Sequence, residues 1–490
     1  MGSPHQSPGK LRPLQLAAII FLTVSGGPYG LEPLFTYVSD HGALLLLLIT
    51  PFLWDVPTIL TVLELNSIMP VTGGYYQWVK HALGIRWAFY EGWWTWLYTF
   101  IDLAIYPVLF IGYAAFFFPE IALYKIPVCL VLIWSSALLN ILGIVPVGKT
   151  SLVLGVLVLT PFLLVFFLLL SHHAANAPAL VSSVVSAHTA VPAVAPTASG
   201  GSPDFPALSM GIYLVMWNFL GWDNATTYAG EVARPVRSYL VSVSIAFVLI
   251  LVIYLLTALS VHRSGIDPAI LKEEGFPALG VLAGGRWLGI LLAAGGMAST
   301  IGMYSAVLLS VSRIPQVMAD DRLLPARLCQ LHSRFRTPYI SIIASSVVVS
   351  ILVLFTFSEL VVMDIVLYAA GLFLEFMALL SLRIKEPLRE RPFRIPLNNT
   401  GLILMILLPV GVYLIALTGE IGASERMAMP VLVALAMLLS AEPVWRLIRW
   451  RNPSVTARRD TTPASVTSSS SVTSPIAGTS PTPGALDANG

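Results

Sequence analysis

Isolated acidic residues interrupt several of the longest apolar stretches of the sequence. Asp102 lies in FIDLAIYPV, Asp223 in FLGWDNATT and Glu375 in LFLEFMALL, and none of these stretches contains a Lys or Arg. An ionised side chain at the centre of a bilayer costs at least about 2.5–3.5 kcal/mol on insertion scales, so such residues mark functional sites. Their common negative charge favours a cavity that binds a cation, or one that takes up protons to neutralise its acids.

Each acid also has a structural interpretation, and the sequence leaves both open. Asp102 binds a substrate amine or a proton, or it accepts hydrogen bonds from a broken helix. Asp223 contacts substrate or caps a broken helix, and Glu375 carries a proton or ties two helices together. Glu32 is a further proton-coupling candidate, whose alternative role is to satisfy freed backbone N–H groups. Asp55 is interpreted as structural.

Aromatic residues near these acids offer a second kind of amine contact. The rings of Tyr106, Trp217, Phe219, Trp222 and Tyr368 could form cation–π walls around an ammonium group. Ordinary packing is the alternative for each of them.

The stretch SGGPYG, Ser25 to Gly30, lies in the middle of the apolar run 14–38. A proline inside a helix costs about 3 kcal/mol and a glycine about 1 kcal/mol relative to alanine, so the stretch predicts a break in a membrane helix. Unwound backbone at that depth is tolerated only where it is buried in protein or lines a cavity. Transporters built from inverted repeats carry two such breaks and bind substrate between them. The second break is predicted at residues 219–227, inside the run 207–231.

The two breaks and the nearby acids define the predicted site. Substrate is expected to contact Ser25, Gly26, Gly27, Pro28, Tyr29, Gly30, Asp102, Tyr106, Trp217, Asn218, Phe219, Gly221, Trp222, Asp223 and Tyr368. The proton-coupling candidates are Asp102, Glu375 and Glu32. A substrate carboxylate would depend on the freed N–H groups of residues 25–30. The acids therefore favour a cationic polyamine or amino acid over an acidic substrate.

The composition assigns the chain to the integral membrane proteins. Of its 490 residues, 57% are hydrophobic and 11% are charged, whereas soluble domains carry about 25% charged residues. Runs of about 20 apolar residues cross a bilayer, and the first run is interpreted as a retained helix rather than a cleaved signal peptide. Twelve spans are predicted, at residues 14–38, 42–66, 88–118, 126–142, 149–170, 207–231, 239–262, 286–312, 339–357, 359–383, 401–419 and 427–447.

The basic residues predict the orientation, because cytoplasmic loops are enriched in Lys and Arg. With the N-terminus inside, five of the 27 basic residues face outside: Lys125, Arg263, Lys272, Arg286 and Arg426. Both termini are therefore expected in the cytoplasm, and the plasma membrane is the expected location. Glu64 and Glu231 are expected near the cytoplasmic face, paired with arginines.

The spans divide the chain into consecutive parts. These are a cytoplasmic N-terminus (1–13), a first five-helix repeat (14–170), a long extracellular loop (171–206), a second five-helix repeat (207–383), two further helices (384–450) and a disordered cytoplasmic tail (451–490). The loop and the tail are rich in Ser, Pro and other small residues. They cannot bury enough apolar surface to offset the entropy of ordering, so we expect neither to form a domain.

Other functional classes find little support. GIVPVGKT, Gly143 to Thr150, matches the phosphate-binding pattern G-x-x-x-x-G-K-[ST], but that loop requires a preceding strand and none is predicted. The eight histidines fall in loops or at helix ends, so we expect no metal site and no hydrolytic dyad in the membrane. Cys129 and Cys329 are interpreted as buried apolar residues. No cofactor and no nucleic-acid partner is expected, and a membrane enzyme or a transporter-like sensor is a weaker hypothesis.

Several motifs, in order, resemble the amino acid–polyamine–organocation transporter superfamily. They are SGGPYG, ELNSIMPVTGGYYQWV (64–79), WNFLGWDNATTYAGEV (217–232) and SAVLLSVSRIPQVMADDRLLP (305–325). GGPYGLE, IDLAIYPVLF, GWDNATTYAGE and LEFMALLSLR are similar to its polyamine:proton symporter branch. The resemblance implies an all-α membrane fold of the leucine-transporter type, with two inverted five-helix repeats and two additional helices. The chain departs from the family in the loop 171–206, in the tail, and in the span 149–170, where some proton-coupled members carry a lysine.

Together these features predict a secondary active transporter that imports a polyamine, or a cationic or neutral amino acid, by proton symport. An amino acid exchanger with the same site is the alternative. The expected partners are the small-molecule amine or amino acid, protons and the lipid bilayer, and the sequence does not indicate the oligomeric state.

Overall fold

The computed structural model describes residues 13–71, 73–142, 149–171, 205–224, 226, 235–311, 313–335, 337–423 and 425–453. Several predicted features lie outside the described residues: the N-terminus before residue 13, the loop 171–206 apart from its ends, residues 143–148 of the phosphate-loop-like motif, Glu231, and the tail after residue 453.

The described chain is built from helices and their connections. In chain order they are α1 (Pro13–Val24), α2 (Leu34–Tyr37), α3 (Asp40–Leu53), α4 (Asp55–Ile68), α5 (Gly74–Leu83), α6 (Ile85–Ala115), α7 (Lys125–Ile141), α8 (Lys149–Ser171), α10 (Phe205–Asn218), α11 (Pro235–Ser264), α12 (Pro268–Glu274), α13 (Phe276–Gly284), α14 (Arg286–Val311), α15 (Arg313–Asp320), α16 (Tyr339–Leu352), α17 (Phe357–Lys385), α18 (Asn399–Ala423), α19 (Glu425–Leu439) and α20 (Ala441–Arg451). Short 3-10 turns at Pro119–Tyr124 and Ala326–Cys329 complete the list.

The helices account for the predicted spans. Within the described residues, nine helical segments are long and apolar enough to cross a membrane: Asp40–Ile68, Ile85–Ala115, Pro119–Ile141, Val153–Ser171, Val236–Ser264, Arg286–Leu308, Phe357–Lys385, Asn399–Gly419 and Met429–Arg451. The shorter helices α1, α10 and α16 occupy the three remaining predicted spans. Two of them, α1 and α10, are short because each ends at a predicted break.

Several boundaries differ from the prediction for local reasons. The span 339–357 ends early, because α16 stops at Leu352 and Thr356 begins the next helix. Thr356 and Glu359 form a capping box, in which each side chain accepts the other residue's backbone N–H. This T-x-x-E pattern marks a helix start. The last predicted span, 427–447, divides into α19 and α20 at Ser440.

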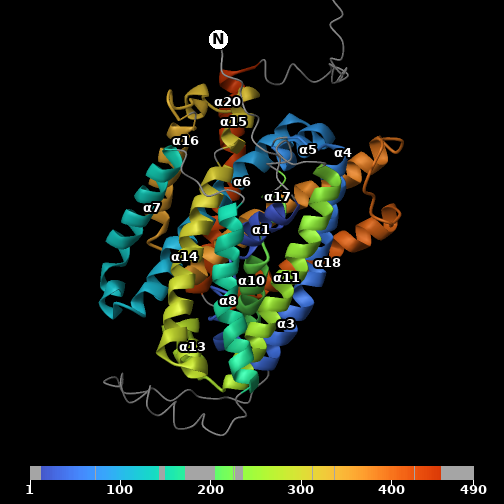
Figure 1. Ribbon diagram of the computed structural model, residues 1–490. Helices are drawn as coiled ribbons and strands as arrows, with labels where there is room; N and C mark the ends of the chain where they lie inside the picture. The colour runs from blue at the N-terminus through green and yellow to red at the C-terminus, as the bar shows by residue number, and fades with distance from the viewer. Residues whose placement is uncertain are drawn as a thin grey trace, which may run out of the picture.

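The helices α5, α12 and α13 were not among the predicted elements. They lie at the ends of the bundle: α5, with α15 and α20, at one end, and α13 at the opposite end (Figure 1). Each is shorter than a membrane span, with 10 residues in α5, 7 in α12 and 9 in α13.

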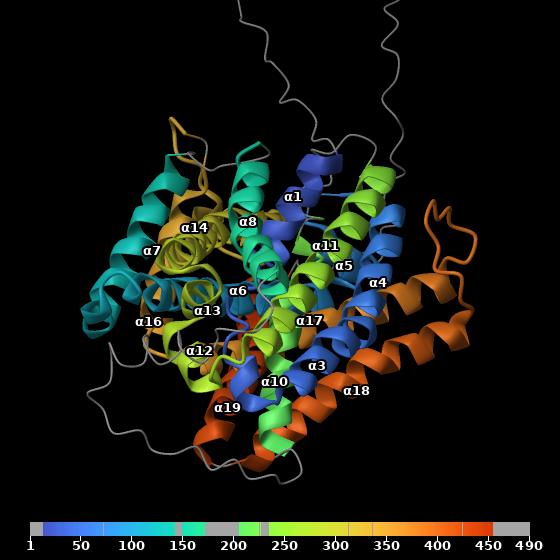
Figure 2. The ribbon, with the colours of Figure 1, turned by 60° about the horizontal axis from the view of Figure 1, so that its bottom comes forward.

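The centre of the bundle is formed by α1, α6, α10 and α17. The long helices α6 and α17 pack against each other, α1 packs against α8 and α11, and α10 contacts α17 and α18. The pair α7 and α16 lies side by side at one edge in both views (Figures 1 and 2). The helices that end at a predicted break, α1 and α10, therefore each pack against long helices without such a break.

The outer surface of the bundle is apolar. Val131 on α7, Val248 on α11 and Leu404 on α18 are exposed, with relative exposures of 71%, 59% and 61%. A ring of exposed aliphatic side chains around long helices is the surface that lipid tails would cover.

Ion pairs stabilise the end of the bundle that carries α5. Glu64 of α4 is completely buried and accepts hydrogen bonds from Nε and Nη2 of Arg383, at 2.8 and 2.5 Å. Lys80 of α5 pairs with Asp321 at 2.6 Å. The predicted pairing of Glu64 with an arginine is thus confirmed, and the pair joins α4 to the end of α17.

Candidate transport site

The first break follows α1 and extends from Ser25 to Pro33, and the short helix α2 begins at Leu34. Gly26, Gly27 and Gly30 have φ values of 59°, 102° and 92°, which L-residues rarely adopt. A Cβ atom on Gly26 would lie 2.1 Å from Sδ of Met303. The predicted non-helical backbone at residues 25–30 is confirmed, and it depends on glycine both for conformation and for space.

Most N–H groups freed by this break already have acceptors within the protein. The N–H groups of Ser25 and Gly26 donate to the carbonyl of Phe21, both at 2.9 Å. Gly27 N–H donates to Oγ of Ser25 at 3.0 Å, and Gly30 N–H donates to Oε2 of Glu32 at 2.7 Å. A substrate carboxylate would have to displace these acceptors.

Glu32 has the contacts expected of its structural alternative. Its carboxylate accepts Gly30 N–H, and its second oxygen accepts the hydroxyl of Tyr113 at 2.9 Å. Tyr113 belongs to α6 and lies 3.1 Å from the same Gly30 nitrogen. Glu32 therefore fixes the far side of the break to α6.

The second break begins where α10 ends, at Asn218. Gly221 has φ 98°, and isolated turns follow, with Asn224 N–H donating to Gly221 O at 3.2 Å and Thr226 N–H to Asp223 O at 2.9 Å. Within the described part of 219–227 the chain is not α-helical, as the inverted-repeat argument predicts.

A tyrosine from α11 joins the two breaks. The hydroxyl of Tyr254 lies 2.6 Å from Oγ of Ser25 and 3.0 Å from the carbonyl oxygen of Asn218. It is buried, and its ring meets Phe219 edge to face with centroids 5.0 Å apart. The two unwound segments therefore lie against each other at the centre of the bundle.

A small cavity lies between the breaks, α6 and α14. Its lining is Thr23, Val24, Ser25, Asp102, Tyr106, Trp217, Asn218, Leu220, Asn224 and Met303. Its volume of about 10 Å³ is near the minimum that holds one water molecule. This conformation is closed around the site, so binding of an amine or amino acid requires the surrounding helices to move apart.

Asp102 brings a carboxylate to this cavity from the middle of α6. Its side chain is buried, and both of its oxygens accept the hydroxyl of Tyr106, one helical turn further on, at 2.8 and 2.9 Å. Among the described residues, the lining contains no Lys, Arg or His. An ammonium group entering the cavity would find Asp102 as its carboxylate partner in the lining.

The predicted substrate residues divide into two groups. Ser25, Asp102, Tyr106, Trp217 and Asn218 line the cavity. Four others, all in the first break, contact neighbouring side chains: Gly26 lies against Met303, Gly27 beside Val158, Gly30 against Trp217, and Tyr29 beside Tyr113 and Phe162.

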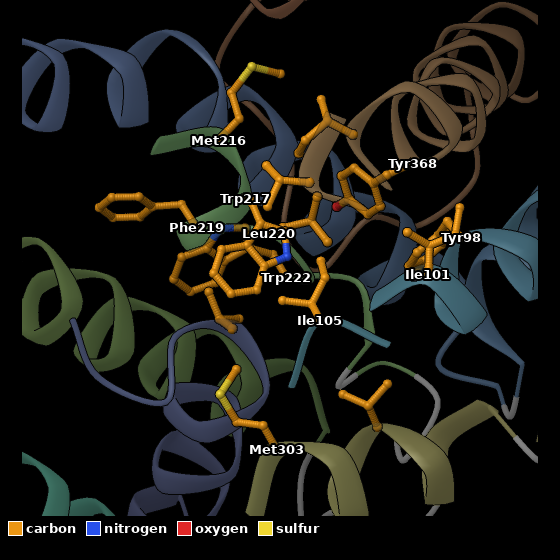
Figure 3. Close-up of a cluster of buried hydrophobic side chains, with 14 of the residues drawn as sticks. Tyr98, Ile101, Ile105, Met216, Trp217, Phe219, Leu220, Trp222, Met303 and Tyr368 are labelled. Atoms are coloured by element: carbon orange, nitrogen blue, oxygen red, sulfur yellow. The ribbon is translucent and has the colours of Figure 1, made fainter. Parts of the chain in front are cut away.

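The aromatic residues of the second break point in different directions. Figure 3 shows Trp217, Leu220 and Trp222 at the centre of the cluster. Phe219 extends to the left, away from Tyr368 on the right, and Met303 lies below the cluster. Trp222 donates its indole N–H to Oδ1 of Asp55 at 3.1 Å, which agrees with the structural interpretation of Asp55. Asp223 accepts the hydroxyl of Tyr368 at 3.1 Å.

Two further buried acids lie outside the cavity lining on α6 and α17, and sequence reasoning missed both. Glu91 on α6 and Asp364 on α17 are 1% and 0% exposed. Glu91, Tyr98 and Asp102 follow one face of α6, and Asp364, Tyr368 and Glu375 follow one face of α17, in both cases at helical spacings of four and seven residues. We call these six residues the carboxyl ladder.

The two faces of the ladder meet in antiparallel register. Tyr98 contacts Tyr368 edge to face, with ring centroids 5.4 Å apart. Seven residues before Tyr98, the Glu91 carboxylate lies against Gly371, which is three residues after Tyr368 and one helical turn before Glu375. The same register brings Asp102 to the side of the tyrosine contact on which Asp364 lies, one turn before Tyr368. An acid pair thus lies on either side of the tyrosine contact.

Several ladder oxygens have no hydrogen-bond partner in the described part of the chain. They are both carboxylate oxygens of Asp364, Oε2 of Glu91 and Oε2 of Glu375. The sequence contains one indication of this arrangement, because acids and tyrosines recur at the same spacings on two spans. The indication is apparent only when the residues on one face of each helix are compared.

Comparison with known proteins gives a family match over most of the chain. The family model described as amino acid permease matches residues 11–438. A probable polyamine transporter of Arabidopsis thaliana is 33% identical over 478 residues, which is 95% of this chain and 93% of the relative. The polyamine transporters RMV1 of Arabidopsis thaliana and PUT1 of Oryza sativa subsp. japonica are each 30% identical, over 90% of this chain and over 88% and 80% of their own lengths.

Proposed function

Because the chain belongs to the amino acid permease family and is a multi-pass membrane transporter rather than an enzyme, we propose that it imports a polyamine, or a cationic or neutral amino acid, by proton symport. The substrate binds between the unwound segments that follow α1 and α10, with an ammonium group at Asp102. The plasma membrane is the proposed location, with both termini in the cytoplasm.

The lining of the central cavity carries this proposal. In the part of the chain that the structure describes, the lining includes one carboxylate, that of Asp102, together with the hydroxyl of Tyr106 and the indole of Trp217, and it includes no basic side chain. A buried carboxylate without a cationic partner favours a positively charged ligand. An aromatic ring beside it adds a cation–π contact.

A polyamine is favoured over an amino acid by the first break. Four of its N–H groups, those of Ser25, Gly26, Gly27 and Gly30, already donate to protein acceptors. A substrate carboxylate would need those donors, whereas a polyamine has no carboxylate. The names of the three relatives above, all polyamine transporters, agree with this preference.

Uptake by proteoliposomes tests the proposal. The purified full chain is reconstituted into liposomes without internal substrate, and labelled putrescine, spermidine, arginine and alanine are added with and without an inward proton gradient. We expect accumulation of a polyamine that depends on the gradient. Uptake that occurs only when substrate is present inside would instead identify an exchanger, and preferential uptake of alanine would contradict the preference for a polyamine over an amino acid.

A further inference from the structure

The acid pair of the ladder furthest from the cavity is formed by Glu91 and Glu375. Both side chains are 1% exposed, and neither belongs to the cavity lining. Glu91 precedes Asp102 by eleven residues on α6, a separation of about 16 Å along a helix axis. Glu91 and Glu375 therefore form a site separate from the proposed ammonium site.

The contacts of this pair leave two oxygens unsatisfied. Oε1 of Glu91 accepts the hydroxyl of Thr95 at 3.3 Å, which is a long hydrogen bond. Oε2 of Glu91 and Oε2 of Glu375 have no partner among the described residues. In the same part of the chain, no basic side chain forms an ion pair with either glutamate. Two neighbouring buried carboxylates without a cation cannot both stay ionised, so a shared proton is the ligand that fits them.

Gly371 of α17 lies directly against the Glu91 carboxylate. A Cβ atom at this position would be 3.0 Å from Oε1 and 3.4 Å from Oε2 of Glu91. Alanine is the better residue for the interior of a helix, so glycine here has a packing reason. The missing side chain leaves room for the Glu91 carboxylate against α17, one helical turn before Glu375.

The other titratable groups facing the pair connect it to the second break. Asp223 is within electrostatic reach of both glutamates. Tyr368 on α17 and Tyr239 on α11 face Asp223 and Glu375, and Tyr239 donates its hydroxyl to the carbonyl of Trp222 at 3.1 Å. Asp223 accepts the hydroxyl of Tyr368, which lies two helical turns before Glu375 on α17, so it connects the unwound segment to the helix that carries Glu375.

We propose that Glu91 and Glu375 together form a proton-binding site, distinct from the substrate cavity, whose occupancy acts on the second break through Asp223. On loading, a proton from water forms an O–H bond with a carboxylate oxygen of one of the two glutamates. On release the same O–H bond breaks and the proton returns to water. The inference rests on the proposed symport and names the residues that carry its proton.

Two measurements on the full chain test this assignment. Infrared difference spectra between acidic and neutral pH should contain a protonated-carboxyl C=O band that Glu375→Gln and Glu91→Gln each remove. In proteoliposomes with an internal pH dye, both variants should lose putrescine-driven proton uptake, while exchange of labelled for unlabelled putrescine continues at the wild-type rate. A variant that keeps the proton uptake, or a band unaffected by both substitutions, overturns the assignment.

Variants at two glycines keep the test decisive if a glutamine variant does not fold. Gly371→Ala places a methyl group against Glu91 and should shift the pH at which proton-driven uptake is half-maximal. Gly112→Ala is the matched control, because Gly112 lies on α6 and a Cβ there meets nothing within 4 Å. Equal pH profiles for the two alanine variants contradict the assignment. If the wild type moves putrescine without protons, symport fails as well, and the infrared band then shows separately whether the pair binds a proton.

Discussion

Tyr98 of α6 and Tyr368 of α17 meet edge to face at the centre of the bundle, with ring centroids 5.4 Å apart and an interplanar angle of 89°. The contact separates the pair Asp102 and Asp364 from the pair Glu91 and Glu375. It also places the hydroxyl of Tyr368 on Asp223 and that of Tyr98 on Asn224, at 3.1 and 3.3 Å. The two tyrosines thus form one layer of contacts that joins α6, α17 and the second break.

Loss of the Tyr368 hydroxyl should destabilise this layer more than loss of the Tyr98 hydroxyl. Tyr368→Phe keeps the ring but removes a donor to a buried carboxylate, which is worth about 1.5–3 kcal/mol when the acceptor is charged. Tyr98→Phe removes a longer bond to a neutral amide, worth about 0.5–1.5 kcal/mol. Unfolding of the two variants in detergent should rank them in that order. The reverse order would show that Asp223 is not anchored by Tyr368.

Gly26→Ala should abolish uptake while the protein stays folded. The φ value of 59° costs an L-residue about 1–2 kcal/mol, and the new methyl group would lie 2.1 Å from Sδ and 2.9 Å from Cγ of Met303, which lines the cavity. Gly112→Ala is again the control, since its side chain would meet open space. Normal uptake by a folded Gly26→Ala protein would show that the break tolerates a side chain.

The buried pair of Glu64 and Arg383 should contribute far more than the exposed pair of Glu442 and Arg446. The side chains of Arg383 and Glu64 are 2% and 0% exposed, whereas Arg446 is 76% exposed. Arg383→Ala removes both charge-assisted hydrogen bonds from arginine to Glu64. Arg391, 3.4 Å away, remains as a weaker partner, so the variant should lose about 3 kcal/mol of stability. Arg446→Ala should cost about 1 kcal/mol or less. Thermal unfolding of both variants measures the difference, and similar losses would contradict it.

Glu386, which follows α17, should give the protein an acid-sensitive contact. Partial burial opposes its ionisation, but hydrogen bonds from Arg389 and His81 outweigh burial and lower its pKa below the usual value. Because the folded-state pKa is the lower one, the stabilisation is present above the unfolded-state pKa and is lost as the pH falls through the folded-state pKa. Glu386→Gln should therefore flatten the fall in Tm on acidification. An unchanged pH profile of Tm would argue against the contact.

Much of this arrangement could be predicted from the sequence, since local composition determines it. Glycine and proline inside an apolar run predicted the break at Ser25 to Gly30, and repeat symmetry predicted its partner near Asp223. An isolated acid in an apolar span predicted Asp102, which lines the cavity. The pairing of Glu64 with an arginine also followed from its place near the end of a span.

The rest depends on which faces of distant helices meet. Glu91 and Asp364 escaped notice because acids were considered singly, whereas the carboxyl ladder arises only when α6 and α17 pack in antiparallel register. Phe219 and Trp222 were expected at the substrate, but they face Tyr254 and Asp55. Helical periodicity does not set side-chain directions where the helix has ended, so the sequence could not distinguish these residues from Trp217.

Binding of putrescine to Asp102→Asn tests the central claim most directly. The substitution keeps the size of the side chain and removes its charge, and a charge-assisted hydrogen bond is worth about 1.5–3 kcal/mol, so the Kd for putrescine should rise by more than about tenfold. Glu375→Gln, measured in parallel at the same pH, should bind putrescine as the wild type does. Wild-type affinity in a folded Asp102→Asn protein would contradict the assignment of the substrate ammonium group to Asp102.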